Sequence, residues 1–165
     1  MNADNPIEMS KKRWRSVIAS TVTALTIIGG LIGIYSFSKN YSGYDLTGEW
    51  AITNTIESTT YRPFMGFRLG YRVFLTQHGT DITGTGEKVS ENDNSLPSSA
   101  HTHISISGAI KGKRVSATFQ EEGTRRKTEG TLDWTYQPQT KTLLGTFKGT
   151  AAEASGRSTG QKVAH

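Results

Sequence analysis

The chain has 165 residues, contains no cysteine and carries a formal net charge of +5 at pH 7. The lack of cysteine excludes disulfides and thiolate metal sites. Much of the positive charge comes from Lys11, Lys12, Arg13 and Arg15, and the rest of the sequence is close to charge balance. The composition therefore argues against the broad basic surface of a general nucleic-acid-binding protein.

The first predicted element is an apolar helix at residues 16–37, which contain no charged residue and directly follow the basic cluster. A helix needs about 20 apolar residues to cross a membrane, whereas the apolar core of a secretory signal peptide has about 7–15. We therefore predict a retained transmembrane helix at 16–37, after a basic cytoplasmic tail at 1–15 and before a linker at 38–44. The positive charge before the helix predicts a cytoplasmic N-terminus and an exported C-terminal domain.

One face of this predicted helix carries small and hydroxylated side chains. Such a face lets two helices approach closely, which predicts a homo-oligomer joined through the membrane. The alternative is that Gly and Thr are simply frequent in membrane helices. The residues expected to form the helix contact are Ala19, Thr23, Thr26, Gly29, Gly30 and Gly33.

The region 45–153 is predicted to be a β-barrel. Apolar and polar residues alternate along several short runs, and turn residues such as His78-Gly79-Thr80-Asp81 separate the runs. Short strands joined by tight turns indicate an all-β fold, and closure removes the exposed edges of such a sheet. We predict a small, closed, antiparallel up-and-down barrel of about eight strands. Residues 154–165 lose the alternation and are expected to fray or to add a weak final strand.

Several motifs resemble those of known barrels. The segment Leu46-Thr47-Gly48-Glu49-Trp50 is similar to the opening strand of the calycin barrels, the lipocalin and avidin group. The wider layout resembles the membrane-anchored β-barrel effectors of bacterial antiphage signalling systems, in which a nucleotidyltransferase makes a cyclic oligonucleotide. The motifs that carry this resemblance after the membrane segment are YRVFLTQ at 71–77, GTGEK at 84–88, EEGTRR at 121–126, GTF at 145–147 and TAA at 150–152.

The resemblance implies a function. In that family the barrel is thought to bind the nucleotide signal, and the proteins then assemble, disrupt the inner membrane and kill the infected cell. It implies a defence effector of the bacterial inner membrane whose partners are the lipid bilayer, a cyclic di- or trinucleotide and further copies of itself. The family typically has two membrane helices where this chain has one, and its cytoplasmic signal requires a cytoplasmic barrel.

The positive-inside pattern supports a different function instead. Under this alternative the chain is an exported, membrane-tethered, lipocalin-like barrel that binds a small apolar ligand or a partner protein. The sequence leaves both functions open.

Candidate ligand-binding residues follow from strand parity and ligand chemistry. Phosphates need cationic donors, and bases need flat surfaces on which to stack. For the aromatic candidates the alternative is core packing, and for Arg126 it is an internal ion pair with Glu87 or Glu121. The predicted lumen set is Tyr71, Arg126, Thr128, Trp134 and Tyr136.

Three further features of the sequence bear on function. The segment 60–68 mixes aromatic rings with cations and is expected to be a barrel lid, a loop at the lipid headgroups or a packed connection. His101 and His103 have a spacing that can bind a metal, but no third ligand follows nearby, so no metal site is predicted. The sequence contains no nucleophile elbow or paired-carboxylate motif, so we expect neither an enzyme nor a cofactor.

Overall fold

The computed structural model describes residues 43–123 and 127–164. The predicted membrane helix at 16–37, its association residues and Arg126 lie outside the described residues. Within the part of the chain that is described, no helix is long and apolar enough to cross a membrane.

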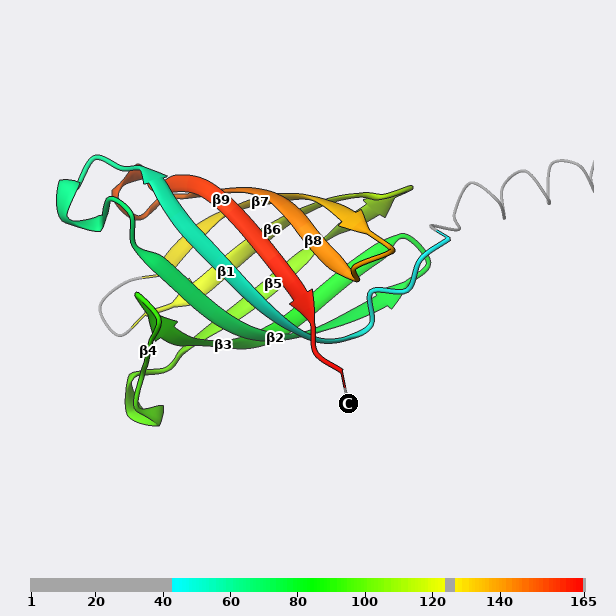
Figure 1. Cartoon of the computed structure of the whole chain (residues 1–165), viewed down its shortest axis with the longest axis horizontal. Helices are drawn as coiled ribbons and strands as arrows, with labels where there is room; N and C mark the ends of the chain where they lie inside the picture. The colour runs from blue at the N-terminus through cyan, green and yellow to red at the C-terminus, as the bar shows by residue number, and fades with distance from the viewer. Residues whose placement is uncertain (1–42, 124–126, 165) are drawn as a thin grey trace, which may run out of the picture. The chain divides into compact units, whose positions relative to one another are not determined.

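The described residues form an all-β fold with three short 3₁₀ helices (Figure 1). The strands are β1 (Gly48–Ser58), β2 (Arg68–His78), β3 (Asp81–Glu91), β4 (Asn94–Ser95), β5 (Thr102–Lys111), β6 (Arg114–Glu122), β7 (Lys127–Gln137), β8 (Thr142–Gly149) and β9 (Ser155–Lys162). The 3₁₀ helices are η1 (Arg62–Phe64), η2 (Ser98–Ala100) and η3 (Ala151–Glu153).

Eight of these strands close into an antiparallel up-and-down barrel. Each barrel strand pairs with the next barrel strand along the chain, and β1 pairs with β2 on one side and with β9 on the other. The two-residue strand β4 pairs only with the end of β3. The predicted fold class, a small closed antiparallel barrel of about eight strands, is confirmed.

Alternation along each strand determines which side chains fill the barrel. On β1, Trp50, Ile52 and Ile56 are buried, whereas Ala51 and Glu57 are exposed. Burying a large apolar side chain stabilises a fold by about 1.5–3 kcal/mol, so this inward-facing set holds the barrel together. The turns that join β2 to β3 and β5 to β6 use Gly79 (φ 63°) and Gly112 (φ 60°), because glycine adopts the left-handed region at little cost.

The barrel extends beyond residue 153. Of the two alternatives expected for residues 154–165, the structure contradicts the frayed tail and shows the final strand. The strand β9 pairs antiparallel with both β1 and β8 and completes the wall. Its inward positions hold small residues, among them Ser158, which is fully buried. At Gly156 a Cβ would collide with the carbonyl oxygen of Thr55. The apolar alternation is weak in this segment because β9 needs close backbone packing there rather than large apolar side chains.

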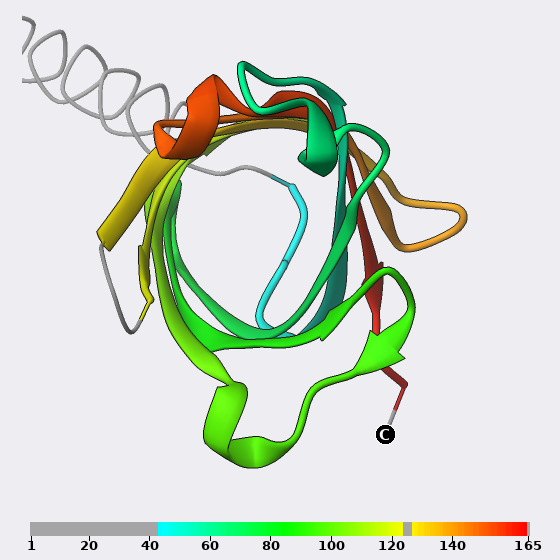
Figure 2. The ribbon, with the colours of Figure 1, turned by 90° about the vertical axis from the view of Figure 1, so that its left-hand side faces the viewer.

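One end of the barrel is closed by the chain that leads into it. Residues 43–47 cross the lumen there, as Figure 2 shows in cyan. The backbone N–H of Leu46 donates to Gln77 Oε1 at 3.0 Å, and Gln77 Nε2 donates to the carbonyl oxygen of Tyr44 at 2.9 Å. The indole N–H of Trp50 donates to the carbonyl oxygen of Leu46 at 2.8 Å. The buried polar groups of this plug therefore have partners, as burial requires.

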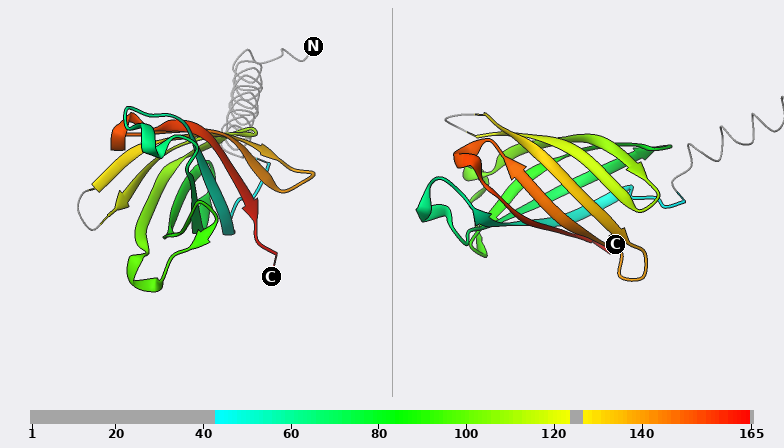
Figure 3. Two further views of the ribbon diagram at one scale, coloured as in Figure 1. Left: turned by 60° about the vertical axis from the view of Figure 1, so that its left-hand side comes forward. Right: turned by 90° about the horizontal axis from the view of Figure 1, so that it is seen from above.

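The opposite end carries the longer connections. The loop between β1 and β2, which contains η1, lies beside η3 in the β8–β9 connection (Figure 3). The backbone N–H of Thr60 donates to the carbonyl oxygen of Ala152 at 2.9 Å, which joins the two loops. These connections border an open end, where the candidate site lies.

Candidate functional site

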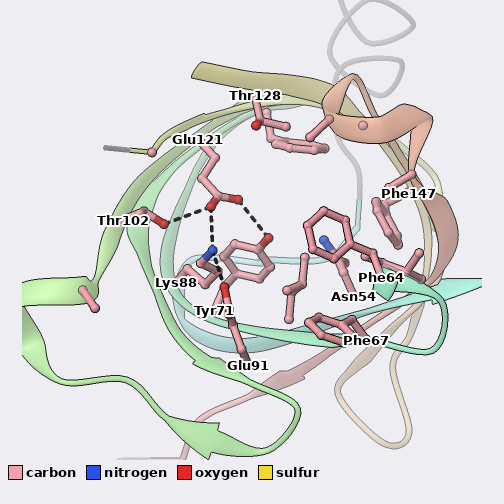
Figure 4. Close-up of a pocket in the computed structure, with 18 residues that line it drawn as sticks. Asn54, Phe64, Phe67, Tyr71, Lys88, Glu91, Thr102, Glu121, Thr128 and Phe147 are labelled. Atoms are coloured by element: carbon pink, nitrogen blue, oxygen red, sulfur yellow. Dashed lines mark hydrogen bonds and ion pairs between the residues drawn. The ribbon is translucent and has the colours of Figure 1, made fainter. Parts of the chain in front are cut away.

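The open end of the barrel contains a cavity of about 440 Å³ (Figure 4). Small-ligand pockets commonly have volumes of about 300–1,000 Å³, so the cavity is large enough for one small molecule. One step deeper along β1, β2 and β5, Ile52, Val73 and Ile104 belong to the packed core. The cavity therefore ends where the barrel core begins.

The cavity has an apolar wall. Phe64 and Phe67 come from the loop before β2, and Phe147 comes from the end of β8 (Figure 4). Phe119 reaches the cavity because its cross-strand partner on β7 is Gly130, where a Cβ would collide with the Phe119 ring. The residues that make up the apolar wall are Ile56, Phe64, Phe67, Leu69, Phe119 and Phe147.

The opposite wall is polar and centres on Glu121 of β6. Its carboxylate accepts hydrogen bonds from the Tyr71 hydroxyl at 3.0 Å and the Thr102 hydroxyl at 2.9 Å. Lys88 Nζ lies 3.2 Å from Glu121 Oε1 and 2.8 Å from Glu91 Oε1. The Lys88 and Glu121 side chains are 15% and 12% exposed, so this ion pair is largely removed from solvent. We call these five residues the Glu121 cluster.

A β-bulge builds part of this cluster. Lys88 and Glu91 are three residues apart and would face opposite sides of a regular strand. The register between β2 and β3 shifts here, because Gly70 pairs with Ser90 but Tyr71 pairs with Lys88. Val89 is the extra residue of the bulge, so Lys88 and Glu91 both face the cavity.

Charges and burial shift two pKa values in the cluster. Burial, together with the charge of Glu121 and the hydrogen bond to it, raises the pKa of Tyr71 well above its usual value. Burial lowers the pKa of Lys88, but its hydrogen bonds to Glu91 and Glu121 and their charges outweigh this effect and leave the pKa raised. At neutral pH Tyr71 is therefore a neutral hydroxyl and Lys88 a cation.

Asn54 is the remaining polar residue with a special position. Its side chain lines the cavity and is only 3% exposed, and it lowers the pKa of Tyr71 against the larger effects of burial and Glu121. Its amide oxygen, Oδ1, has no hydrogen-bond partner among the described residues. A buried acceptor without a partner costs free energy, so this oxygen is a place where a ligand can bind favourably.

The structure brings together only part of the predicted lumen set. Tyr71 and Thr128 line the cavity. Trp134 and Tyr136 are buried in the core instead: the Trp134 indole N–H donates to Ser158 Oγ at 2.8 Å, and the Tyr136 ring packs edge-to-face on Tyr44 at 5.3 Å. Arg126 lies outside the described residues. The predicted residues lie at different depths because strand parity determines which face of the sheet a side chain is on, but not its depth in the barrel.

Sequence reasoning did not select Asn54, Lys88 or Glu91. Asn54 has the parity of Trp50 and Ile52, which could have identified it as an inward-facing polar residue. Lys88 likewise shares the parity of the buried Gly84 on β3. Glu91 had no such signal, because the bulge reverses its expected face.

The other candidate segments have defined positions. Glu87 is exposed on the outer face of β3, away from Glu121. Its Oε2 lies 2.8 Å from His101 Nδ1, within hydrogen-bonding distance. His103 is exposed on β5. In the 60–68 segment the Phe64 ring packs on Tyr61 and Phe67, at centroid distances of 4.8 and 5.6 Å. This segment forms one rim of the cavity.

We compared the chain with protein-family models, curated proteins and solved structures, and none of the three comparisons found a match.

Proposed function

We propose that this protein is a small-molecule receptor that binds its ligand in the cavity at the open end of the barrel. The observation that carries the proposal is a cavity with an aromatic wall facing a polar cluster, in a barrel whose other end is packed and plugged. Ligand pockets commonly combine an apolar lining, which supplies binding free energy, with a few polar groups that orient the ligand.

The cavity favours a ligand with a flat or apolar body. Phe64, Phe67 and Phe147 offer ring surfaces on one side, and the Glu121 cluster offers hydrogen-bonding groups on the other. This chemistry fits the lipocalin-like function, in which the barrel binds a small and largely apolar ligand. In this function the predicted helix at 16–37 serves as a tether.

The second candidate is the antiphage effector that binds a cyclic di- or trinucleotide and then oligomerises to disrupt the inner membrane. The ring surfaces of the cavity favour it, because aromatic side chains stack bases. The charges do not favour it: Lys88 is the only cation among the described cavity-lining residues, and Glu91 and Glu121 already pair with it. Phosphates would need further cations, and Arg125 and Arg126 are the nearest in sequence to Gly123 at the cavity.

The test is isothermal titration calorimetry on the full-length protein in lipid nanodiscs, because detergent molecules can themselves occupy an apolar cavity. One panel contains cyclic di- and trinucleotides, and the other contains neutral aromatic and aliphatic small molecules. Saturable binding from the neutral panel alone supports the small-ligand receptor. Saturable binding of a cyclic nucleotide that weakens in Arg126→Ala supports the effector.

A matched pair of variants locates the binding. Thr128 lines the cavity, and Thr131 is exposed on the outer face of the same strand. Thr128→Phe fills the cavity and should abolish binding, whereas Thr131→Phe adds the same ring outside and should leave it unchanged. Equal binding by both variants, or no binding from either panel by a folded protein, would contradict a receptor function for this cavity.

A further inference from the structure

The deep end of the cavity contains an unused hydrogen-bond acceptor. Asn54 is 3% exposed and lines the cavity, and its Oδ1 has no partner among the described residues. The next inward residue towards the core, Ile52, is apolar and buried. Buried polar atoms in native structures nearly always have a partner, so this oxygen calls for one that enters with a ligand.

The neighbouring acceptor, Glu121, does not share this property. Its two carboxylate oxygens already accept from Tyr71 and Thr102 and contact Lys88. The Tyr71 hydroxyl is likewise engaged, since its own proton is donated to Glu121. A ligand group that donates an N–H at the cavity floor would therefore find its unfilled partner in Asn54 Oδ1.

The charges of the cavity restrict the ligand further. Among the described residues that line it, the carboxylates Glu91 and Glu121 outnumber the single cation Lys88. Lys88 lies within 3.2 Å of both carboxylates, so it has little attraction left for another anion. An anionic group placed beside this cluster would lose its hydration and face net negative charge.

We propose that Asn54 is the specificity residue of the cavity, and that it selects an uncharged ligand with a flat apolar body and an amide-type or amino-heterocycle N–H at its deep end. This inference rests on the proposed receptor function. The N–H donates to Asn54 Oδ1, and the flat body lies against the wall formed by Phe119 and Phe147. The amino-bearing edge of a nucleobase belongs to this class, and a phosphate does not.

Three matched probes test the proposal on the full-length protein in nanodiscs by calorimetry. The probe 2-naphthamide carries amide N–H donors, N,N-dimethyl-2-naphthamide has none, and 2-naphthoate is an anion. A net hydrogen bond corresponds to a factor of about ten in affinity. We expect 2-naphthamide to bind about tenfold more tightly than the dimethyl amide, and 2-naphthoate to bind most weakly.

The variant Asn54→Leu keeps the size of the side chain and removes the acceptor. It should bind both amides with similar affinity, so that the preference disappears while binding persists. A merely structural role for Asn54 would lower thermal stability and leave the preference unchanged, which would overturn the proposal.

The wild-type comparison stands even where this variant fails to fold. Equal affinity of the wild-type protein for all three probes would overturn the selectivity and leave the receptor function standing. No binding of any probe by a folded protein would overturn both the selectivity and the receptor function for aromatic ligands.

Discussion

The two ends of the barrel are built from the same strands with the same alternation, yet they are filled differently. At the closed end Trp50, Leu75 and Trp134 are almost fully buried and the leading segment plugs the lumen. At the open end the inward positions of β1 and β2 include Asn54 and Tyr71. These and polar side chains from neighbouring strands surround a cavity.

The difference indicates a division of roles along the barrel axis. The packed end supplies the stability that a small barrel needs, because its large apolar side chains are almost fully buried. The open end gives up part of that burial and instead holds a largely buried ion pair, which adds little net stability. Such a combination is typical of a binding site supported by a rigid scaffold.

Removal of β9 should disrupt both ends of the barrel and have the largest effect on stability. A chain that ends at Ala154 loses the strand that pairs with β1 and β8 and leaves two long edges open. We expect no cooperative unfolding transition in urea, measured by near-ultraviolet circular dichroism. A control that ends at Val163 keeps β9 and should unfold like the full chain. A cooperative transition in the shorter chain would contradict the closed barrel.

Truncating one aromatic side chain at each end should cost different amounts of stability. Trp50→Ala removes a fully buried ring and its hydrogen bond to Leu46, and should lower the free energy of unfolding by about 3–5 kcal/mol. Phe64→Ala removes a partly buried ring at the rim and should cost about 1 kcal/mol. Urea denaturation measures both values. Equal losses would mean that the rim is as tightly packed as the closed end.

Removing the charge of Glu121 should have a moderate effect on the stability of the fold. Glu121→Gln keeps the shape and one acceptor oxygen but removes the charge that faces Lys88. Because Lys88 keeps its contact with Glu91 at 2.8 Å, we expect a loss of about 1–2 kcal/mol in the free energy of unfolding, measured in urea at pH 7. Glu122→Gln, on the exposed outer face of the same strand, is the control and should change stability by less than about 1 kcal/mol. An equal loss in both variants would rule out a special role for the cluster.

Alkaline pH should reduce the contribution of the Glu121 cluster to the stability of the fold. The folded-state pKa values are both raised, that of Tyr71 by burial and Glu121, and that of Lys88, against the effect of burial, by Glu91 and Glu121, so the folded protein favours the protonated forms. Their contribution to stability is complete below the unfolded values of about 10 and is lost as pH rises through the folded values. The stability difference between wild type and Tyr71→Phe should be constant from pH 7 to about pH 9 and shrink above about pH 10. A difference that grows with pH would show the opposite shift.

The fold could be predicted from the sequence because alternation and turn residues act locally. Parity correctly placed Trp134 on the inner face, since every second side chain of a strand faces the same way. The final strand could be expected only as an alternative to a frayed tail, because its inward residues, such as Ser158 and Gly160, are small.

The candidate site was less predictable because depth and register are not local properties. Tyr136 has the parity of a lumen residue but packs at the closed end against Tyr44 and Trp50. Glu91 reaches the cavity only through a bulge that depends on pairing with β2. Asn54 was detectable by parity, but its missing partner becomes visible only when the neighbouring strands are in place.

A bound ligand should occupy the open end of the barrel and leave the closed end packed. Intermolecular nuclear Overhauser effects between 2-naphthamide and the full-length protein in nanodiscs test it most directly. We expect contacts from the naphthyl protons to the rings of Phe119 and Phe147, and none to Trp134 or Tyr136. Contacts to Trp134 and Tyr136 instead, or no contacts in a protein whose spectrum shows a folded barrel, would contradict it.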